Sequence, residues 1–272
     1  MVRQRCLRLG CVAGRVRCRE NVVGPLPVRR VEARRGGVRR GALPPVVMVW
    51  PCALPVEMYV AAGRDVAVPR PSCLGCSLPM MFWSGYERSV RAEGRCHRLW
   101  IVRARCPLCR VSHALLPNFL LVGRLDVVDA IGQGLAGVVS ERVSIGGAAA
   151  RLDVPFTTVR GWVRRFTATA ARWWSAFSSL TVELGGTIPA RWPGVVPAAA
   201  IAAMGWAHAA ASARHELRTG SLWSFVSVVC GGALIVTNID PPWRVFGNRR
   251  FIPPSPFPGI VRKEPDDEQR DV

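Results

Sequence analysis

Two Cys-x-x-Cys pairs constrain the fold of this 272-residue chain more than any other feature. Cys73 and Cys76 form the first pair, and Cys106 and Cys109 form the second. Zn²⁺ prefers four soft ligands in a tetrahedron, and each pair can supply two thiolates from one tight turn. Because four thiolates leave no open position for water, we predict a structural Zn²⁺ that closes a module too small for a core of its own.

Other residues near the two pairs could replace one of the four cysteines as a metal ligand. The usual four-cysteine finger has roughly 15–20 residues between its pairs, and the interval here is longer, although a longer loop adds little closure entropy. Cys96, His97 and His113 therefore stay as alternative ligands, and His113 is more typical of a packing residue. Two chance pairs in a chain with ten cysteines are the remaining alternative.

The charge of the chain favours anionic partners. Its formal net charge is +19, and Lys263 is the only basic residue other than arginine and histidine. Nucleic acid and an anionic membrane surface are the partners that such a charge suits. The cysteines outside the two pairs show no regular spacing, which disfavours a secreted disulfide framework, so we expect a reducing cytoplasm.

Residues 1–47 differ in composition from the rest of the chain. They carry 12 arginines against Glu20 and Glu32, and they lack the apolar periodicity that a folded core needs. We hypothesise that Met48 is the true start and that residues 1–47 belong to an over-extended reading frame. A disordered tail and a basic arm that grips phosphates are the alternatives.

Residues 48–118 are predicted to form a zinc-ribbon-like module. A short helix over 56–63 and strands over 66–68 and 99–102 would place each cysteine pair on a knuckle at the end of a β-hairpin. Arginines are interspersed with aromatic residues here, which is typical of a surface that binds a phosphate backbone. The same pattern is equally compatible with an ordinary hairpin exposed to solvent. These residues are Arg88, Arg91, Arg95, Arg98, Arg103 and Arg105, together with Trp83, Tyr86 and Trp100.

Residues 119–185 are predicted to form a helix-turn-helix domain. Apolar residues at spacings of three and four predict a helix over 125–139. A second helix over 144–152 has Ser144 as its N-cap. Three helices with a short turn before the last are typical of the trihelical DNA reader.

The third helix of this domain is the predicted DNA reader. It follows the turn Asp153-Val-Pro155, covers residues 156–166 and continues as helix over 172–184. Its N-terminal part would face base edges and its later arginines would hold phosphate. The predicted base contacts are Thr157, Thr158 and Arg160, and the predicted phosphate contacts are Arg164 and Arg165. An ordinary helical hairpin with a solvated basic face is the alternative.

The C-terminal residues divide into a region over 186–252 and a disordered, charged tail over 253–272. In the first region we predict an Ala-rich helix over 195–213, followed by strand-like stretches over 225–229 and 233–236. A membrane hairpin is the alternative. Alanine is only weakly favoured in lipid, and the second stretch is short, so the sequence disfavours a membrane span.

Three motifs carry a resemblance to a known group of proteins. They are the Cys-x-x-Cys pair followed by Phe-Trp-Ser-Gly-Tyr at residues 82–86, the segment Arg-Cys-x-x-Cys-x-x-x-His-Ala-Leu-Leu-Pro at 105–117, and the helical motif at 153–166. From about Met48 to the region of Arg250, the chain resembles an uncharacterised actinobacterial family of unknown function. It is also similar to the zinc ribbon and helix-turn-helix that open insertion-sequence transposases. The resemblance implies DNA binding related to mobile elements, and not a known reaction.

The sequence therefore predicts an α+β fold, mainly α, and a zinc-stabilised helix-turn-helix protein that binds double-stranded DNA in the cytoplasm. A homodimer is compatible with this reading. We expect no enzymatic activity, because the acidic residues after Phe166 lack the length and strand context of a two-metal nuclease core. A divergent transposase or nuclease using Glu183, Glu216 and Asp240 is one alternative. A membrane-attached DNA-binding regulator is the other.

Overall fold

The structure is a computed structural model that describes residues 47–74, 76–214 and 220–236 of the chain. The expectations for residues 1–46 and for the tail over 253–272 lie outside the described residues, as do Glu216 and Asp240. The described part combines six α-helices with a four-stranded sheet, which confirms a mixed helix-and-sheet fold.

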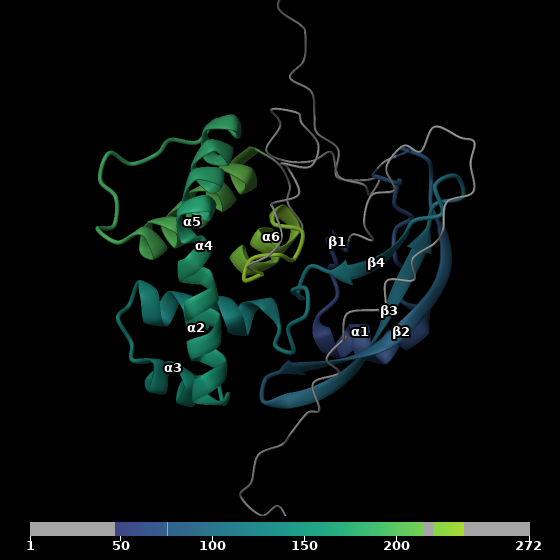
Figure 1. Ribbon diagram of the computed structural model, residues 1–272, viewed down its shortest axis with the longest axis horizontal. Coiled ribbons are helices and arrows are strands. Elements are labelled where there is room, and N and C mark those ends of the chain that lie inside the picture. The colour runs from purple at the N-terminus through teal and green to yellow at the C-terminus, as the bar shows by residue number, and fades with distance from the viewer. Residues whose placement is uncertain (1–46, 75, 215–219, 237–272) are drawn as a thin grey trace, which may run out of the picture. The chain divides into compact units, whose positions relative to one another are not determined.

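The sheet is built around one long β-hairpin. Its strands β2 (Met81–Ala92) and β3 (Arg95–Arg105) pair antiparallel along their whole length (Figure 1). Glu93 and Gly94 both have positive φ, at 47° and 70°, as the central residues of a tight two-residue hairpin turn require. β4 (Ser112–Pro117) pairs antiparallel with β3, and β1 (Met48–Trp50) pairs parallel with β4, in the order β1-β4-β3-β2.

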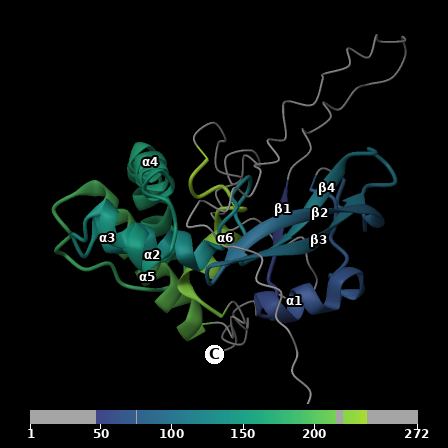
Figure 2. The same cartoon turned by 90° about the horizontal axis from the view of Figure 1, so that it is seen from below.

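One short helix covers part of this sheet. It is α1 (Val56–Ala62), which ends at Gly63 as predicted and is followed by the 3₁₀ turn η1 (Gly63–Asp65); Figure 2 shows it below the strands. Tyr59 is fully buried, and its hydroxyl donates to the carbonyl oxygen of Trp100 at 2.9 Å. The helix is therefore fixed to β3 by a hydrogen bond within an apolar contact.

The predicted strand over residues 66–68 is wrong. This segment belongs to no strand in the structure, although Val66 is buried in the sheet cluster. Pro69 and Pro71 follow it directly, and a proline has no backbone N–H to donate to a ladder. The apolar side chains of the segment are therefore used for packing without strand pairing.

Three helices follow the sheet: α2 (Val128–Val139), α3 (Ile145–Arg151) and α4 (Phe156–Glu183). Ser144 caps α3 as predicted, because its hydroxyl oxygen accepts from the N–H of Gly147 at 3.0 Å. The two helical stretches predicted over 156–166 and 172–184 form one continuous helix.

The first of these helices begins later than residue 125 for a physical reason. The backbone N–H of Arg91 donates to the carbonyl of Leu125 at 2.7 Å, and that of Val127 donates to Arg91 at 3.1 Å. Arg91 Nε also lies 2.6 Å from Oδ1 of Asp126, whose side chain is 5% exposed. Residues 125–127 are therefore held by strand β2, and α2 begins only after them.

The last two described helices are α5 (Val196–Arg214) and α6 (Leu222–Val229). The strands predicted over 225–229 and 233–236 are wrong, because the first stretch lies in α6 and the second forms turns. Ser221 caps α6 by accepting from the N–H of Ser224 at 3.0 Å. Most residues of α6 are buried on every side, and such a short apolar run has no periodicity that separates helix from strand.

Two hydrophobic clusters organise the described residues. One contains the strands, α1 and residues up to Val127. The other contains α2 to α6, so that α5 and α6 share their core with α4. The segment between Phe119 and Val127 connects them, since Ser227 Oγ donates to the carbonyl of Leu120 at 2.7 Å and Val122 N–H donates to that of Gly232 at 2.9 Å.

Helix α5 is the one described helix that is long and apolar enough to cross a membrane, over residues 196–213. Its buried face packs against α4, and 44% of that window is buried inside the protein. The core helix of a soluble protein passes the same test of length and composition, so α5 is weak support for a membrane span.

Candidate metal centre and candidate nucleic-acid interface

The first cysteine pair lies in a small turn that precedes β2. Met80 N–H donates to the carbonyl of Pro71 at 2.9 Å, which closes the base of the turn. At its tip, Cys73 N–H donates to Leu78 and Ser77 N–H donates to Cys73, both at 2.8 Å. Ser77 takes a positive φ of 57°, which lets the chain turn back directly after the pair.

The second cysteine pair lies between β3 and β4 and repeats this arrangement. Cys106 N–H donates to the carbonyl of Val111 at 2.9 Å, and Arg110 N–H donates to Cys106 at 3.1 Å. Arg110 follows its pair with a φ of 63°, as Ser77 does. The two pairs therefore sit on knuckles with the same hydrogen-bond pattern, although they come from different parts of the chain.

The two knuckles bring four sulfur atoms together. The Sγ atoms of Cys73, Cys76, Cys106 and Cys109 all lie within 4.8 Å of one another, and those of Cys73 and Cys109 are 3.6 Å apart. These cysteines are not joined as disulfides, in which the sulfurs would be about 2.05 Å apart. A tetrahedron with metal–sulfur bonds of about 2.3 Å has edges of about 3.8 Å, so the sulfurs are close enough to hold a metal ion.

The four thiols influence one another's ionisation through hydrogen bonds. Burial raises the pKa of the Cys106 thiol, but hydrogen bonds from the backbone of Cys109 and Leu108 outweigh it and lower that pKa to about 7. The hydrogen bond to Cys109 is the main cause that raises the pKa of Cys76 to about 12. Four neighbouring thiolates repel one another, so full ionisation of the cluster needs a positive ion between them.

The alternative ligands lie elsewhere. Cys96 and His97 are opposite Arg91 and Val90 near the turn of the hairpin, and about ten residues of strand place Cys96 roughly 30 Å from Cys106. His113 is buried on β4 opposite Ala104. Among the described residues, the group able to hold a metal ion consists of the four cysteines.

The predicted DNA-reading residues lie on the first half of α4. Thr157, Arg160 and Arg164 are exposed, and Thr158 and Arg165 are partly buried. The opposite stripe, with Val159, Trp162 and Phe166, is buried in the helical cluster. The helix thus presents a polar and basic face to solvent, and the assignment of these residues to bases or phosphates stays a prediction.

The structure brings together two turns whose proximity the sequence did not indicate. A Cβ atom built on Gly94 would lie 3.3 Å from Oδ2 of Asp153, so the turn of the β2–β3 hairpin lies beside the turn between α3 and α4. Arg95, the first residue of β3, is exposed at this turn. The proximity depends on the length of the hairpin and on its contacts with residues 125–127, which no local sequence signal reports.

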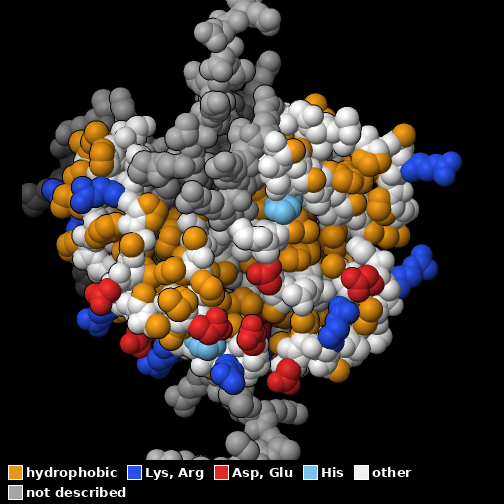
Figure 3. All heavy atoms as spheres, turned by 180° about the vertical axis from the view of Figure 1, so that it is seen from behind, with side chains coloured by type: hydrophobic (Ala, Val, Ile, Leu, Met, Phe, Trp, Pro, Cys, Tyr) orange, Lys and Arg blue, Asp and Glu red, His pale blue; other side chains and the backbone are white. Residues whose placement is uncertain are grey.

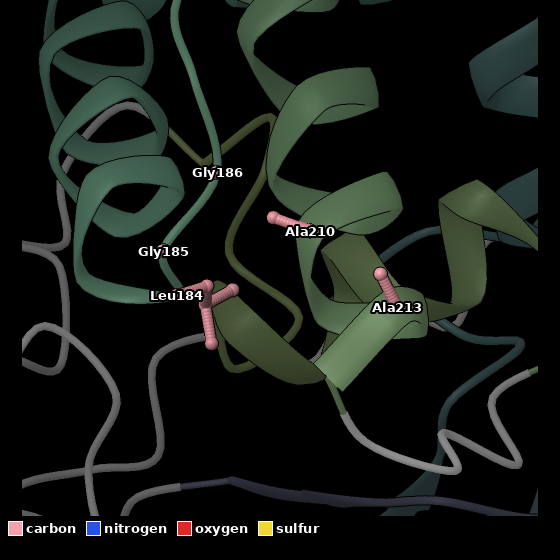
Figure 4. Close-up of a pocket in the computed structure, with 5 residues that line it drawn as sticks. All are labelled: Leu184, Gly185, Gly186, Ala210 and Ala213. Carbon is pink, nitrogen blue, oxygen red and sulfur yellow. The ribbon is translucent and has the colours of Figure 1, made fainter.

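The enzymatic alternative named three carboxylates, of which the structure describes one. Glu183 ends α4, and the other two carboxylates proposed with it lie outside the described residues. An open pocket of about 450 Å³ lies between the end of α4 and α5 (Figure 4). It is lined by Leu184, Gly185, Gly186, Ala210 and Ala213. None of these side chains is an acid, a base or a nucleophile.

Comparisons with known proteins give no family for the chain: no family model, no curated protein and no solved structure matches it.

Proposed function

We propose that this chain is a zinc-stabilised helix-turn-helix protein that binds double-stranded DNA, either as a regulator or as a relative of insertion-sequence transposases without a nuclease core. The observation that carries the proposal is the face of α4. A short connection separates α3 from α4, and the first exposed polar residues of α4 are Thr157 and Arg160, followed by Arg164. Such residues suit base edges and phosphates when a helix enters the major groove.

The proposed metal is Zn²⁺, held in a zinc-ribbon arrangement. Four thiolates in a tetrahedral set favour Zn²⁺ or iron, and two knuckles that each give two sulfurs are typical of structural zinc modules. Since all four positions are filled by protein, the ion would brace the sheet and leave no site for a reacting water. The metal would therefore serve the fold, in a protein acting in the cytoplasm.

The first test is binding to duplex DNA. Purified protein loaded with Zn²⁺ would be mixed with a library of random duplexes, and the bound sequences would be recovered and used in titrations at several salt concentrations. We expect selection of a defined sequence and an affinity that falls steeply with salt, because each phosphate contact releases counterions. No shift of duplex DNA at low salt would contradict the proposal.

Substitutions of two arginines on α4 should distinguish a contact to a base from a contact to a phosphate. Arg160→Ala should cost about 1–3 kcal/mol on the selected site and relax its preference at one position. Arg164→Ala should weaken binding to all duplexes alike. It should also reduce the slope of log affinity against log salt concentration by about 1. The measurement is fluorescence anisotropy on the selected site and on a scrambled duplex.

Arg191→Ala is the matched control for these variants. Arg191 is exposed in the segment after α4, beside Trp192, whose ring lies 5.1 Å from that of Trp174. Trp174 is about 20 Å along α4 from Arg160, so Arg191 lies away from the predicted DNA-contacting residues. It removes the same charge without touching the proposed interface. If Arg191→Ala weakened binding as strongly as Arg160→Ala did, general charge and not the α4 face would explain the affinity.

A further inference from the structure

A second surface lies at the metal end of the hairpin, on one face of β2 and β3. Directly opposite residues of an antiparallel pair share a face, which places Met81 with Arg105 and Tyr86 with Ile101. Alternation along β3 adds Arg103 to this face. Trp83 joins it at the irregularity in β2, because the guanidinium carbon of Arg105 lies 4.8 Å from the centre of its ring. We call Met81, Trp83, Tyr86, Arg103 and Arg105 the hairpin face.

Three large side chains of this face are open to solvent, whereas Ile101, opposite Tyr86, is buried. Trp83 and Met81 are each 60% exposed, and Tyr86 is 39% exposed. Neighbouring Phe82 is also exposed, as is Leu108 on the second knuckle. Figure 3, which views the protein from behind, shows that exposed hydrophobic side chains are common on its surface, so exposure alone does not define a site. What sets the hairpin face apart is a cluster of aromatic rings interleaved with arginines.

The charge around these rings selects an anionic partner. Residues 69–118 contain eight arginines against Glu87 and Glu93, and Glu87 is paired with Arg98 at 2.7 Å. Even a Zn²⁺ with four thiolates, which carries two negative charges, would leave this segment positive. A partner that offers flat apolar rings as well as negative charge is single-stranded nucleic acid, since a duplex hides the faces of its bases.

The metal knuckle also holds one of the arginines in place. Arg105 Nε donates to the carbonyl oxygen of Arg110, 3.3 Å away, and Arg110 closes the second knuckle. The same guanidinium lies against the ring of Trp83. The cysteine cluster therefore orders both the charge and the ring that a base and its phosphate would meet.

We infer that the hairpin face binds single-stranded DNA, with bases stacked on Trp83 and Tyr86 and with phosphates held by Arg103 and Arg105. The face lies at the opposite end of the hairpin from the turn at Gly94, about 30 Å away along the strands. It is therefore a separate site from the face of α4, and its binding does not depend on the proposed duplex contact.

The test uses the full chain loaded with Zn²⁺ and a fluorescein-labelled oligothymidylate of about 12 nucleotides, followed by anisotropy. Trp83→Ala and Tyr86→Ala should each weaken binding about tenfold, the effect of losing one stacked base. Val182→Ala removes an equally exposed apolar side chain on α4 and should leave the affinity unchanged. Circular dichroism and metal content would confirm that each variant is folded.

Charge and site identity are tested by arginine variants. Arg105→Ala should weaken oligothymidylate binding more than Arg191→Ala, which removes the same charge elsewhere. Arg160→Ala should leave this binding intact while weakening the duplex, so failure of one proposal is distinguishable from failure of the other. The inference is overturned if the oligonucleotide does not bind at low salt, or if Trp83→Ala behaves like Val182→Ala. It is also overturned if sedimentation shows a dimer that Trp83→Ala dissociates, because a second copy would then cover this face.

Discussion

Replacing Cys106 with serine should abolish metal retention and unfold the part of the sheet that contains the two knuckles. Cys106 is fully buried, and its sulfur is held by the backbone of its own knuckle within the four-sulfur cluster. A serine hydroxyl is a poor ligand for a soft metal ion, so the variant would offer only three thiolates, too few to retain the ion. Structural zinc contributes about 10–16 kcal/mol in zinc-finger peptides, and we expect loss of most of that contribution here.

The measurement is metal per chain by elemental analysis, with thermal unfolding recorded before and after a chelator. The wild-type protein should hold one ion and lose stability on chelation. Cys106→Ser should hold none and respond little to the chelator, because it starts from the metal-free level. Loss of metal without any change in stability would show that the ion does not brace the fold.

Cys52→Ser is the matched control for this experiment. Cys52 is buried in the same hydrophobic cluster as Cys106, but it is not part of the four-sulfur group. Its substitution should cost about 1 kcal/mol, as a polar replacement in a core does, and should leave the metal content at one. Equal metal loss in both variants would contradict the proposed ligand set.

Gly132→Ala should destabilise the helical cluster by about 2–3 kcal/mol, although alanine is the better helix former. Gly132 is buried in α2, where α6 packs against it. A Cβ atom at this position would overlap ring carbons of Trp223, whose indole is itself buried. The ring cannot move aside without opening the core, so the clash exceeds the gain of about 1 kcal/mol in helix propensity.

Gly146→Ala provides the opposite expectation within the same protein. Gly146 lies in α3, and a Cβ there would meet nothing within 4 Å. The substitution should therefore stabilise the protein by about 0.5–1 kcal/mol through helix propensity alone. Chemical denaturation at constant metal load compares the two variants, and equal effects at both positions would refute the role of close packing at Gly132.

A double substitution tests the contact itself. Trp223→Ala alone should cost about 3–5 kcal/mol, because it empties a large buried site. In the background of Trp223→Ala, the change Gly132→Ala should no longer destabilise, since the ring that it overlaps is gone. Additive effects in the double variant would place the cost of Gly132→Ala in some other contact.

The sequence predicted best those elements whose ends carry their own chemical signal. Ser144 and Gly63 mark helix ends by local hydrogen bonding and backbone freedom, and both lie where they were expected. The two cysteine pairs were sufficient to predict a cluster of four sulfur atoms close enough to hold a metal ion. What they could not exclude was Cys96 or His97, because the register of β2 with β3 is needed to place these residues at the far end of the hairpin.

The sequence predicted less well where tertiary contacts decide the conformation. Residues 225–229 are rich in β-branched and aromatic side chains, yet the surrounding helices bury them from all sides, and a helix satisfies their backbone. Asp126 falls within the helix predicted over residues 125–139, but it lies before α2, where its carboxylate binds Arg91 of β2. The proximity of Gly94 to Asp153 has no local signature at all.

The side chain of Arg88 limits how this protein can be divided. It extends from β2 to donate to the carbonyl of Leu121 at 2.7 Å, and also to that of Arg124, beyond the predicted boundary at residue 118. Cutting the chain at residue 118 would leave the half-buried guanidinium of Arg88 without its acceptors in one fragment. The other fragment would keep the two carbonyls without their donor. The two parts are therefore poor cassettes for recombination, and a chimera that exchanges either one would need to carry residues 119–127 together with the hairpin.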